Sequence, residues 1–517
     1  MCGIAGIVDL ALQRPADRQV LQRMCWSLVH RGPDEEGAYV DGPVALGIRR
    51  LSIIDVAGGQ QPIHNEERSI WVVLNGEIYN FPDLRAELEK SGHRFSTHSD
   101  TEVIAHLYEE KGAECVRTLR GMFAFALYDE RQKRLLLARD RLGKKPLYYA
   151  IHNGQLLFGS EIKALLAAAP ELAQVSQESV LSYFCFGYIP DPLTAFVPIR
   201  KLPPGHYLEL ADGKVQLHPY WDLPPYSDSS PSSEEDALQE LEERLTEAVR
   251  IRLISEVPLG ALLSGGVDSS TVVALMRRTS SGPVKTFSIA FRHADFNEAE
   301  YARAVARAFE TEHHEMIVDP DIWGTLDALT RSLEEPLADS TVVPQFHLSR
   351  MARQHVTVAL AGDGGDELFA GYERYHTHLR RNWANAIPHW LGRAHRSLID
   401  PLLPAGFPGR RLLFNLSLPE RDRFLDSVSF FPNGAKDHSL FSDDFQAATA
   451  KFASPYERFR QYYDHAPAAD PLSRLLYLDT KTNLPGDILT KADRMSMAVS
   501  LELRAPLLDH VVAEWAA

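Results

Sequence analysis

The arrangement of hydrophobic segments along this chain changes at a stretch rich in proline and serine, residues 222–233. Its sequence, DLPPYSDSSPSS, is typical of an exposed linker. Before it, short hydrophobic strands follow one another with turn residues between them, whereas after it strands alternate with helical patterns. The sequence therefore predicts two domains of different class, residues 2–215 and 236–517, joined by a linker over residues 216–235.

The first domain contains strands such as SIWVVLNGEIYN and FAFALYDE, with turn residues between them. Helical patterns interrupt these strands near residues 16–29 and 81–91. This order predicts a layered α+β domain rich in antiparallel strands and disfavours a doubly wound parallel sheet.

The second domain opens with an amphipathic helix. Ser232 and Glu235 have the spacing of a capping box, and leucines at helical spacing follow them. From PLGALL to VTVALAG, strands and helices then alternate, which predicts an open parallel α/β sheet. Residues 375–475 have no clear period, and we expect them to form helical cover with loops.

Composition limits the classes of partner. The 517 residues include 54 basic and 70 acidic side chains, and the resulting charge of −16 disfavours nucleic-acid and anionic-membrane binding. The apolar start lacks a basic leader, and no apolar run approaches the ~18 residues of a membrane span. The four cysteines lack CxxC spacing, so neither a zinc site nor a disulfide framework is indicated. We expect a cytoplasmic protein with small-molecule partners.

Cys2 follows the initiator methionine directly. Removal of Met1 would leave a free α-amine, with a reference pKa of about 7.7–8.0, beside a thiol of about 8.5. That amine can accept the thiol proton, so one residue would carry both the nucleophile and its base. Taken alone, a cysteine here is weak evidence, because a small residue entering a strand is the simpler interpretation.

Five segments set Cys2 in a wider pattern. They are MCGIAGI at the start, HRGPD from His30, RRLSIID from Arg49, NGEIYN from Asn75 and SDTE from Ser99. In order and spacing they resemble the class II glutamine amidotransferases. The resemblance implies an Ntn-hydrolase-like sandwich in which Cys2 attacks the carboxamide of glutamine.

The same resemblance implies roles for five further residues. Asn75 and the backbone amide of Gly76 would stabilise the tetrahedral oxyanion. Arg50 would bind the α-carboxylate of glutamine with its planar fork, and Asp100 would pair with the α-ammonium group. Glu77 is also expected at the substrate, with an ordinary turn residue as the alternative. For Arg50 and Asp100 the alternative is a surface ion pair.

The segment HRGPD also allows a structural interpretation. His30, Arg31 and Asp34 have side chains suited to catalysis, yet RGPD forms an efficient turn, since Pro33 fixes φ and Gly32 is conformationally free. We expect these residues to support the pocket rather than to react.

In the second domain, PLGALLSGGVDSS is an apolar strand that passes through Ser264, Gly265 and Gly266 into a helix. Backbone amides converge in such a turn and form an anion site. The loop lacks the lysine of GxxxxGK[ST], which excludes a kinase-type P-loop. SGGxDS resembles the ATP pyrophosphatase loop, which implies release of pyrophosphate and transfer of AMP to the substrate.

A second loop, AGDGGDELFAGY, also follows an apolar strand and begins at Ala361. In a parallel sheet both loops lie at the carboxyl ends of strands, where they can face one another. Asp268 and Asp366 are then candidates to hold Mg2+ against the ATP phosphates. The alternative role for both is to cap a helix N-terminus.

Nearly the whole chain resembles the asparagine synthetases of the B type, including LTKADRMSMAVSLELRAP near the end. The resemblance implies that Asp363 lies near an acyl-adenylate and that Lys491 and Arg494 act as cations. Asp363 and Arg494 stand where many family members have glutamate and lysine, which leaves their roles open. The implied nucleotide contacts are Leu263, Ser264, Gly265, Gly266, Asp268, Ser269, Ile289, Ala361 and Gly362.

The combined prediction is an enzyme that releases ammonia from glutamine at Cys2 and uses it to amidate an adenylated carboxylate. Aspartate is the favoured acceptor, with ATP and Mg2+ as cofactors and with asparagine, AMP and pyrophosphate as products. The alternative is the same chemistry on a peptide, an antibiotic precursor or a sugar acid. The segment EEPLADSTVVP, residues 334–344, is expected to contact the acceptor through Asp339 or Ser340.

The resemblance carries three further expectations. Free ammonia is largely protonated in neutral water, so the family implies an internal passage between the domains. It also implies a homodimer. Family members usually continue beyond DHVVAEWAA, so we expect a missing C-terminal segment.

Overall fold

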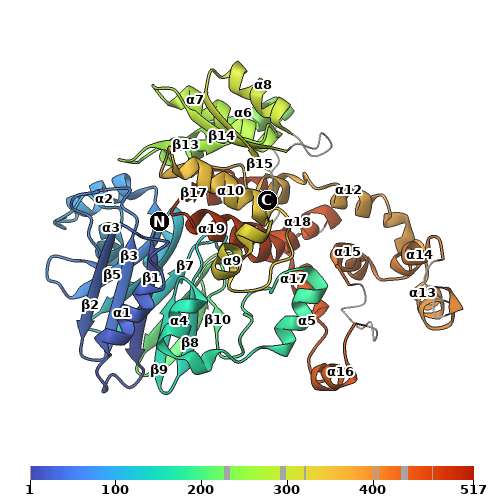
Figure 1. Ribbon diagram of the computed structural model, residues 1–517, viewed down its shortest axis with the longest axis horizontal. Helices are drawn as coiled ribbons and strands as arrows, with labels where there is room; N and C mark the ends of the chain where they lie inside the picture. Colours follow the sequence, from blue (N-terminus) through green and yellow to red (C-terminus); the bar gives the residue numbers. More distant parts are fainter. Residues whose placement is uncertain are drawn as a thin grey trace.

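The computed structural model shows two domains whose β-sheets are of different kinds (Figure 1). The first domain has antiparallel sheets, and the second has a parallel sheet with a helical region beside it. The structure describes residues 2–225, 233–291, 298–318, 322–399, 402–404, 407–431, 440–468 and 470–517.

The first domain is built on two six-stranded sheets, with orders β10-β8-β9-β1-β3-β2 and β12-β11-β7-β6-β5-β4. All of their strand pairs are antiparallel. The strands are β1 (Gly3–Asp9), β2 (Glu35–Asp41), β3 (Val44–Arg50), β4 (Ile63–His64), β5 (Ile70–Ile78), β6 (Gly121–Asp129), β7 (Arg134–Arg139), β8 (Tyr148–His152), β9 (Gln155–Gly159), β10 (Arg200–Lys201), β11 (His206–Ala211) and β12 (Lys214–Pro219).

The two sheets pack face to face, because alternate strand residues of both form one core, with Val8 and Leu46 against Val73 and Ala126. Helices cover the outer faces through two further cores. These helices are α1 (Arg18–Trp26), α2 (Phe81–Lys90), α3 (Glu102–Lys111) and α4 (Ile162–Ala168). Helix α5 (Gln177–Phe186) packs instead into the core of the helical region of the second domain. The predicted layered, Ntn-hydrolase-like sandwich is confirmed.

The two helices predicted near residues 16–29 and 81–91 are present as α1 and α2. Helix α3 was not predicted, and its burial explains why. Its residues from Glu102 to Tyr108 are all buried, so the helix lacks the polar face that produces a helical period.

The second domain contains a five-stranded sheet of order β15-β14-β13-β16-β17 in which every pair is parallel. This confirms the predicted open parallel α/β sheet. Its strands are β13 (Leu259–Leu262), β14 (Lys285–Phe291), β15 (Glu312–Val318), β16 (Val358–Leu360) and β17 (Glu502–Arg504). The helices nearest to it in sequence are α6 (Glu234–Ile251), α7 (Val267–Thr279), α8 (Ala299–Ala308), α9 (Ile322–Leu333), α10 (Val342–Arg353) and α11 (Gly365–Phe369).

Helices follow from α11 onward and extend to one side of the sheet (Figure 1), so the predicted helical cover over residues 375–475 is confirmed. They are α12 (Glu373–Leu379), α13 (His389–Ala394), α14 (Arg410–Leu416), α15 (Glu420–Val428), α16 (Asp443–Thr449), α17 (Tyr456–His465), α18 (Pro471–Lys481), α19 (Leu489–Met497) and α20 (His510–Ala516). Short 3-10 or π turns occupy Gly112–Arg117, Pro170–Leu172, Asn382–Ala386, His395–Ile399 and Leu484–Ile488. Among the described residues, no helix combines the length and the hydropathy needed to cross a lipid bilayer.

The connection between the domains is shorter than the predicted linker. Strand β12 takes up residues 216–219 as part of the first domain, because they pair with β11. Helix α6 begins at Glu234, and its N-cap is Ser233, whose hydroxyl accepts from the Asp236 N–H at 3.1 Å. The predicted capping box is therefore shifted by one residue, and Ser232 itself lies outside the described residues.

Candidate active sites

Cys2 lies just before β1, in the layer between the two sheets of the first domain. Its backbone N–H donates to Asn75 Oδ1 at 3.0 Å, which connects β1 to the opposite sheet. The register pairs Gly3 with Arg49, so Cys2 comes next to Arg50. Burial raises the pKa of the Cys2 thiol, although the Leu51 backbone and the Arg50 guanidinium oppose the rise. A thiol in this state needs a base close by before it can act as a nucleophile.

Asn75 and Gly76 lie in β5, and both have features that suit an oxyanion site. The Nδ2 group of Asn75 is buried and has no hydrogen-bond partner among the described residues. A buried amide donor without a partner is costly unless a ligand accepts from it. Gly76 has φ +148°, and a Cβ there would lie 2.0 Å from the Met122 carbonyl oxygen, so no side chain fits.

Two buried carboxylates lie near Asn75: Glu77 is in β5 itself, and Asp100 lies beside the strand. The Ile78 N–H donates to Asp100 Oδ2 at 2.7 Å. Burial, with Glu502 adding to it, raises the pKa of Asp100 to about 6 in spite of that hydrogen bond. Burial and the neighbouring Asp100 also raise the pKa of Glu77, whose Oε2 has no hydrogen-bond partner among the described residues. Adjacent carboxylates of this kind favour a cationic ligand, such as an α-ammonium group.

Arg50 lies close to Cys2, but its terminal nitrogens already have protein partners. Nη1 donates to Glu35 Oε2 at 2.8 Å, and Nη2 donates at 2.9 Å to the carbonyls of Ile54 and Asp55. Arg50 and Asp100 are each 4 % exposed, so neither belongs to a surface ion pair. Arg50 therefore also holds the chain segment that follows β3.

The predicted supporting role of the HRGPD segment is confirmed. Arg31 Nε donates to the Cys2 carbonyl at 3.1 Å, and its Nη groups reach Asp493 at 2.8 and 3.0 Å in the second domain. Asp34 Oδ2 accepts from the Ser52 N–H at 2.9 Å. His30 lies 3.1 Å from Glu161. The Arg31 contacts hold Cys2 and tie it to the neighbouring domain, whereas these side-chain contacts of Asp34 and His30 lie within the first domain.

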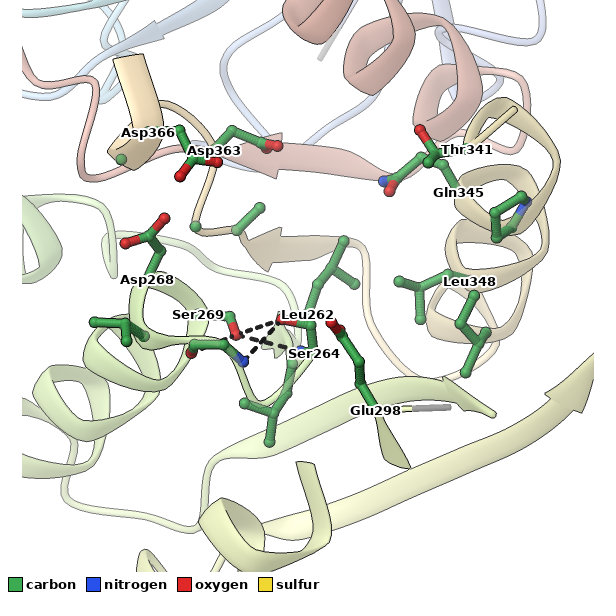
Figure 2. A pocket seen from close by; sticks show the side chains of 18 of the residues that line it. Leu262, Ser264, Asp268, Ser269, Glu298, Thr341, Gln345, Leu348, Asp363 and Asp366 are labelled. Carbon is green, nitrogen blue, oxygen red and sulfur yellow. Dashed lines mark hydrogen bonds between the residues drawn. The ribbon is translucent and has the colours of Figure 1, made fainter. Parts of the chain in front are cut away.

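A cavity of about 1240 Å³ opens at the carboxyl ends of β13, β14 and β16 in the second domain (Figure 2). The two predicted loops face one another across it, since β13 and β16 are neighbours in the sheet. Its volume is ample for a nucleotide together with a small acceptor. The predicted residues that line it are Leu263, Ser264, Gly266, Asp268, Ser269, Ile289, Ala361, Gly362, Asp363 and Asp366.

The turn before α7 is closed by its own serines. The Ser264 N–H donates to Ser269 Oγ at 3.2 Å, and the Gly266 N–H donates to Ser264 Oγ at 3.2 Å. Gly265 does not line the cavity, contrary to its predicted contact role. Its φ is +89°, and a Cβ there would lie 2.5 Å from the Ala302 backbone nitrogen in α8. Gly265 thus shapes the turn by packing against α8.

Three carboxylates, those of Asp268, Asp363 and Asp366, gather at one end of the cavity (Figure 2). Burial raises the pKa of Asp268, and the charges of Asp366 and Asp363 raise it further. Carboxylates that destabilise one another in this way fit a hard cation such as Mg2+. The capping alternative fails, because the N-caps of α7 and α11 are Gly266 and Gly364.

The two predicted cations are placed differently. Lys491 Nζ donates to Asp339 and to Thr341 Oγ1, and Thr341 lines the cavity. Burial raises the pKa of Asp363, and the Lys491 charge partly offsets this effect, so Lys491 acts electrostatically on the cavity.

Arg494, the other predicted cation, does not line the cavity. It is fully buried between the domains, where it pairs with Glu161 at 2.8 Å and Glu334 at 3.0 Å and donates to the Tyr148 hydroxyl. Its charge is thereby engaged by two carboxylates at the domain interface.

One wall of the cavity lies only partly within the predicted acceptor segment, which includes Thr341 but ends before Gln345 and Leu348. Thr341, Gln345 and Leu348 lie at or in α10 and face the carboxylates from the opposite side (Figure 2). Ser340, one of the two expected acceptor contacts, lines the cavity beside them, whereas Asp339 contacts Lys491. No local motif marks these α10 residues, because only packing brings the helix to the strand ends.

Comparison with known proteins gives two family matches. Residues 1–221 match the glutamine amidotransferase domain, and residues 240–517 match asparagine synthase. Asparagine synthetase [glutamine-hydrolyzing] 1 of Bacillus subtilis is 35% identical over 99% of this chain and 80% of that protein. A putative asparagine synthetase [glutamine-hydrolyzing] of Mycobacterium tuberculosis is 34% identical over 99% of this chain and 81% of that protein. Amidase chry2 of Gibberella zeae is 30% identical over 100% of this chain and 82% of that protein.

Proposed function

Because this chain belongs to the family of glutamine-hydrolysing asparagine synthetases, we propose which of its residues carry each step of the family's reaction. The enzyme takes nitrogen from glutamine and, with ATP, converts aspartate into asparagine. The observation that supports the assignment best is the pairing of two sites. Cys2 lies beside an unpartnered buried amide of Asn75, and a separate cavity carries a glycine-rich turn and three carboxylates.

In the first site, Sγ of Cys2 attacks the carboxamide carbon of glutamine. After removal of Met1 the α-amine takes the thiol proton and passes it to the departing ammonia, while Asn75 Oδ1 holds that amine by the contact it already makes to the Cys2 nitrogen. Asn75 Nδ2 and the Gly76 N–H stabilise the oxyanion. Water then hydrolyses the glutamyl thioester to glutamate.

Recognition of glutamine rests on opposite charges at its α-carbon. Asp100, supported by Glu77, binds the α-ammonium group, and Arg50 binds the α-carboxylate. Because Nη1 of Arg50 contacts the half-exposed Glu35, binding of the substrate carboxylate requires that pair to rearrange.

In the second site, the Ser264–Gly266 turn and the first amides of α7 hold the phosphates of ATP, with Leu263 and Ile289 beside the adenosine. Asp268 and Asp366 hold Mg2+, which supplies neutralisation of phosphate charge. A carboxylate oxygen of aspartate attacks the α-phosphorus, pyrophosphate leaves, and ammonia then displaces AMP. Lys491 orients the acceptor segment through Asp339 and Thr341 and offsets the charge of Asp363.

Ammonia reaches the second site inside the protein, since it would be protonated in bulk water. By analogy with its family, the enzyme is proposed to form a homodimer. It also places the enzyme in a reducing cytoplasm, in keeping with four cysteines that are all buried and free.

A second acceptor remains a candidate because of two observations. Asp363 stands where family members commonly have glutamate, and one relative of nearly full length is named an amidase. Under this alternative the glutaminase step is unchanged and a different carboxylate is adenylated.

The decisive experiment supplies amide-15N glutamine, ATP, Mg2+ and aspartate, followed by mass spectrometry. We expect 15N-asparagine, AMP and pyrophosphate. Formation of ADP and orthophosphate would overturn the adenylation step, and glutamate without labelled asparagine would favour another acceptor.

A variant at Cys2 tests whether glutamine hydrolysis and amide synthesis occur at separate sites. Cys2→Ala should abolish use of glutamine and retain synthesis from ammonium salt. Cys25→Ala, at another buried cysteine in α1, is the matched control and should retain both activities. The intact mass of the wild-type chain should lack Met1.

A further inference from the structure

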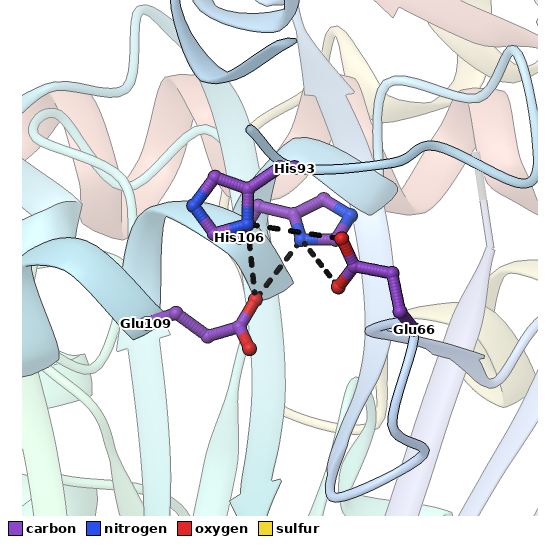
Figure 3. A group of neighbouring side chains, drawn as sticks. All are labelled: Glu66, His93, His106 and Glu109. Atoms are coloured by element: carbon purple, nitrogen blue, oxygen red, sulfur yellow. Dashed lines mark hydrogen bonds and ion pairs between the residues drawn. The ribbon is translucent and has the colours of Figure 1, made fainter. Parts of the chain in front are cut away.

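Four metal-ligating side chains converge in the first domain, apart from the residues assigned to glutamine (Figure 3). Glu66 lies in the turn between β4 and β5, His93 follows α2, and His106 and Glu109 lie one turn apart on α3. One ligand atom from each lies within 4.8 Å of the other three. None of these four side chains has a role in the proposed reaction.

Four distances from the two Nδ1 atoms to the two carboxylates lie near the edge length of a tetrahedral metal site. His106 Nδ1 lies 3.0 Å from Glu109 Oε2 and 3.5 Å from Glu66 Oε2. His93 Nδ1 lies 3.5 Å from Glu109 Oε2 and 3.9 Å from Glu66 Oε1. Tetrahedral zinc binds nitrogen and oxygen at about 2.0–2.2 Å, which separates the ligand atoms by roughly 3.3–3.6 Å. The widest separation among the four ligand atoms is up to 4.8 Å, so the side chains would close in by about 1 Å around an ion.

Contacts of the two Nε2 atoms with carboxylates orient both imidazoles so that their Nδ1 atoms face the middle of the cluster. His93 Nε2 contacts Glu110 Oε1 at 2.9 Å, and His106 Nε2 faces Glu102 Oε1 at 3.7 Å. A histidine whose Nε2–H faces a carboxylate presents the lone pair of Nδ1, which is the arrangement common behind metal ligands. Here both Nδ1 atoms face the carboxylates of Glu66 and Glu109, an arrangement that a bound cation would stabilise.

Further hydrogen bonds hold the carboxylates in position. The Asn65 side-chain amide donates to Glu109 Oε1 at 2.7 Å, and the Arg94 N–H donates to Glu66 Oε1 at 2.6 Å. The first bond leaves Glu109 Oε2 toward the centre, whereas Glu66 Oε1, which accepts from Arg94, is also the oxygen that lies 3.9 Å from His93 Nδ1. Glu102 accepts from the N–H groups and hydroxyls of Ser96 and Thr97. The carboxylates of Glu66 and Glu109 are thus held in place without a bound ion.

We propose that Glu66, His93, His106 and Glu109 bind one divalent transition-metal ion of the zinc class. Two imidazole nitrogens favour such an ion over Mg2+ or Ca2+, which prefer oxygen ligands. The side chain of Glu66 is 32% exposed, which leaves a path for the ion, whereas His106 is fully buried. All four positions are filled by protein, so the role is structural.

The ion would tie three separate segments together. Two of them are loops, and the third is α3, which begins directly after Asp100 and Thr101. The sequence does not indicate this site, because its ligands come from distant segments and include no cysteine. Metal binding therefore stabilises the edge of the domain that carries a glutamine contact.

The test uses the full-length, tag-free chain, stripped of metal and dialysed against Zn2+ with excess Mg2+ to occupy oxygen sites. We expect about one zinc per chain and a higher unfolding temperature with zinc than without it. His93→Gln and Glu66→Gln, at partly exposed positions, should lose the bound zinc and the temperature shift. His152→Gln is the matched control, since His152 contacts Glu171 on the surface of the same domain.

Cobalt distinguishes this site from Cys2. Bound Co2+ should show the visible bands of tetrahedral nitrogen and oxygen coordination without the charge-transfer band of a thiolate ligand. A thiolate band, or equal zinc binding by wild type and His93→Gln, would overturn the proposal. Absence of zinc binding by the wild type would also overturn it, and the cluster would then be an ion-pair network of protonated histidines.

Discussion

Asn75 uses the two ends of its side-chain amide for different purposes. Its Oδ1 accepts from the Cys2 nitrogen, while Nδ2 is buried without a partner among the described residues. A strand residue is well suited to this role, because pairing of Asn75 with Ala124 of β6 fixes the backbone of β5 at this position.

Replacing this amide tests the oxyanion assignment. Asn75→Asp keeps the shape and Oδ1 and removes the Nδ2 donor. We expect kcat for glutamine hydrolysis to fall about 10²–10³-fold, the usual effect of losing one oxyanion donor. Synthesis from ammonium salt serves as the internal control and should be unchanged. A variant with wild-type kcat would remove Asn75 from the mechanism.

The pH dependence of glutamine use tests Asp100. Burial raises the pKa of Asp100 to about 6, and only its ionised form attracts the α-ammonium group. The ionised fraction therefore falls as the pH drops through about 6. We expect protonation of Asp100 to lower kcat/KM for glutamine by a further factor of about ten per pH unit below that value, on top of the effect of the Cys2 amine, because kcat/KM reports the free enzyme.

The pH profile of kcat is compared with that of kcat/KM, both measured by glutamate release from about pH 5 to 8. Bound substrate stabilises the ionised carboxylate, so kcat should fall at lower pH than kcat/KM does. The Cys2 amine would affect both parameters together. Identical acid limbs in the two profiles would argue against Asp100.

At the scale of elements, the glycine-rich turn depends on one close approach between two helices. Gly265 combines a φ of +89° with backbone contact to α8, and the turn continues directly into α7. This packing sets where the first amides of α7 point.

Gly265→Ala should therefore damage the second site alone. Strain at a left-handed position costs about 1–3 kcal/mol, and the clash with Ala302 adds to it. We expect the KM for ATP to rise at least about tenfold in AMP formation from aspartate and ammonium salt. Glutamine hydrolysis should persist. Gly282→Ala is the control, since nothing lies within 4 Å of a Cβ at that position. Equal behaviour of the two variants would contradict the role of Gly265.

At the scale of the whole molecule, buried ion pairs join the two domains. Arg31 contacts both the Cys2 carbonyl and Asp493 on α19. Asp509 likewise pairs with Arg120 of the first domain and Arg252 of the second. The position of the glutaminase nucleophile is thus linked mechanically to the synthetase helix that carries Lys491.

Asp493→Asn weakens this link without touching either site. Removing one partner of a buried pair costs up to about 3–5 kcal/mol. The cost is smaller here, because Arg31 keeps a second carboxylate partner, Glu161, at 2.8 Å. We expect lower resistance to urea and less asparagine formed per glutamine hydrolysed, measured as the ratio of asparagine to glutamate. Asp444→Asn, at an exposed position of α16, should match the wild type. An unchanged ratio in Asp493→Asn would show that the link is not needed for transfer.

The sequence by itself determined the class of each domain, the two loops at the strand ends and the motif that contains Cys2. These features depend on neighbours in the chain: alternation produces strands, and glycine and serine close the turn before α7. Nearly all of the predicted cavity residues accordingly line the cavity.

Only the tertiary structure decided the rest. Helix α3 is buried along most of its length and so lacks a helical period, and Arg494 is drawn to Glu161 and Glu334 rather than to the nucleotide cavity. The α10 wall and the histidine–glutamate cluster bring together residues with no local relation. Such contacts arise from the packing of distant segments, which local propensity and hydrophobic periodicity do not encode.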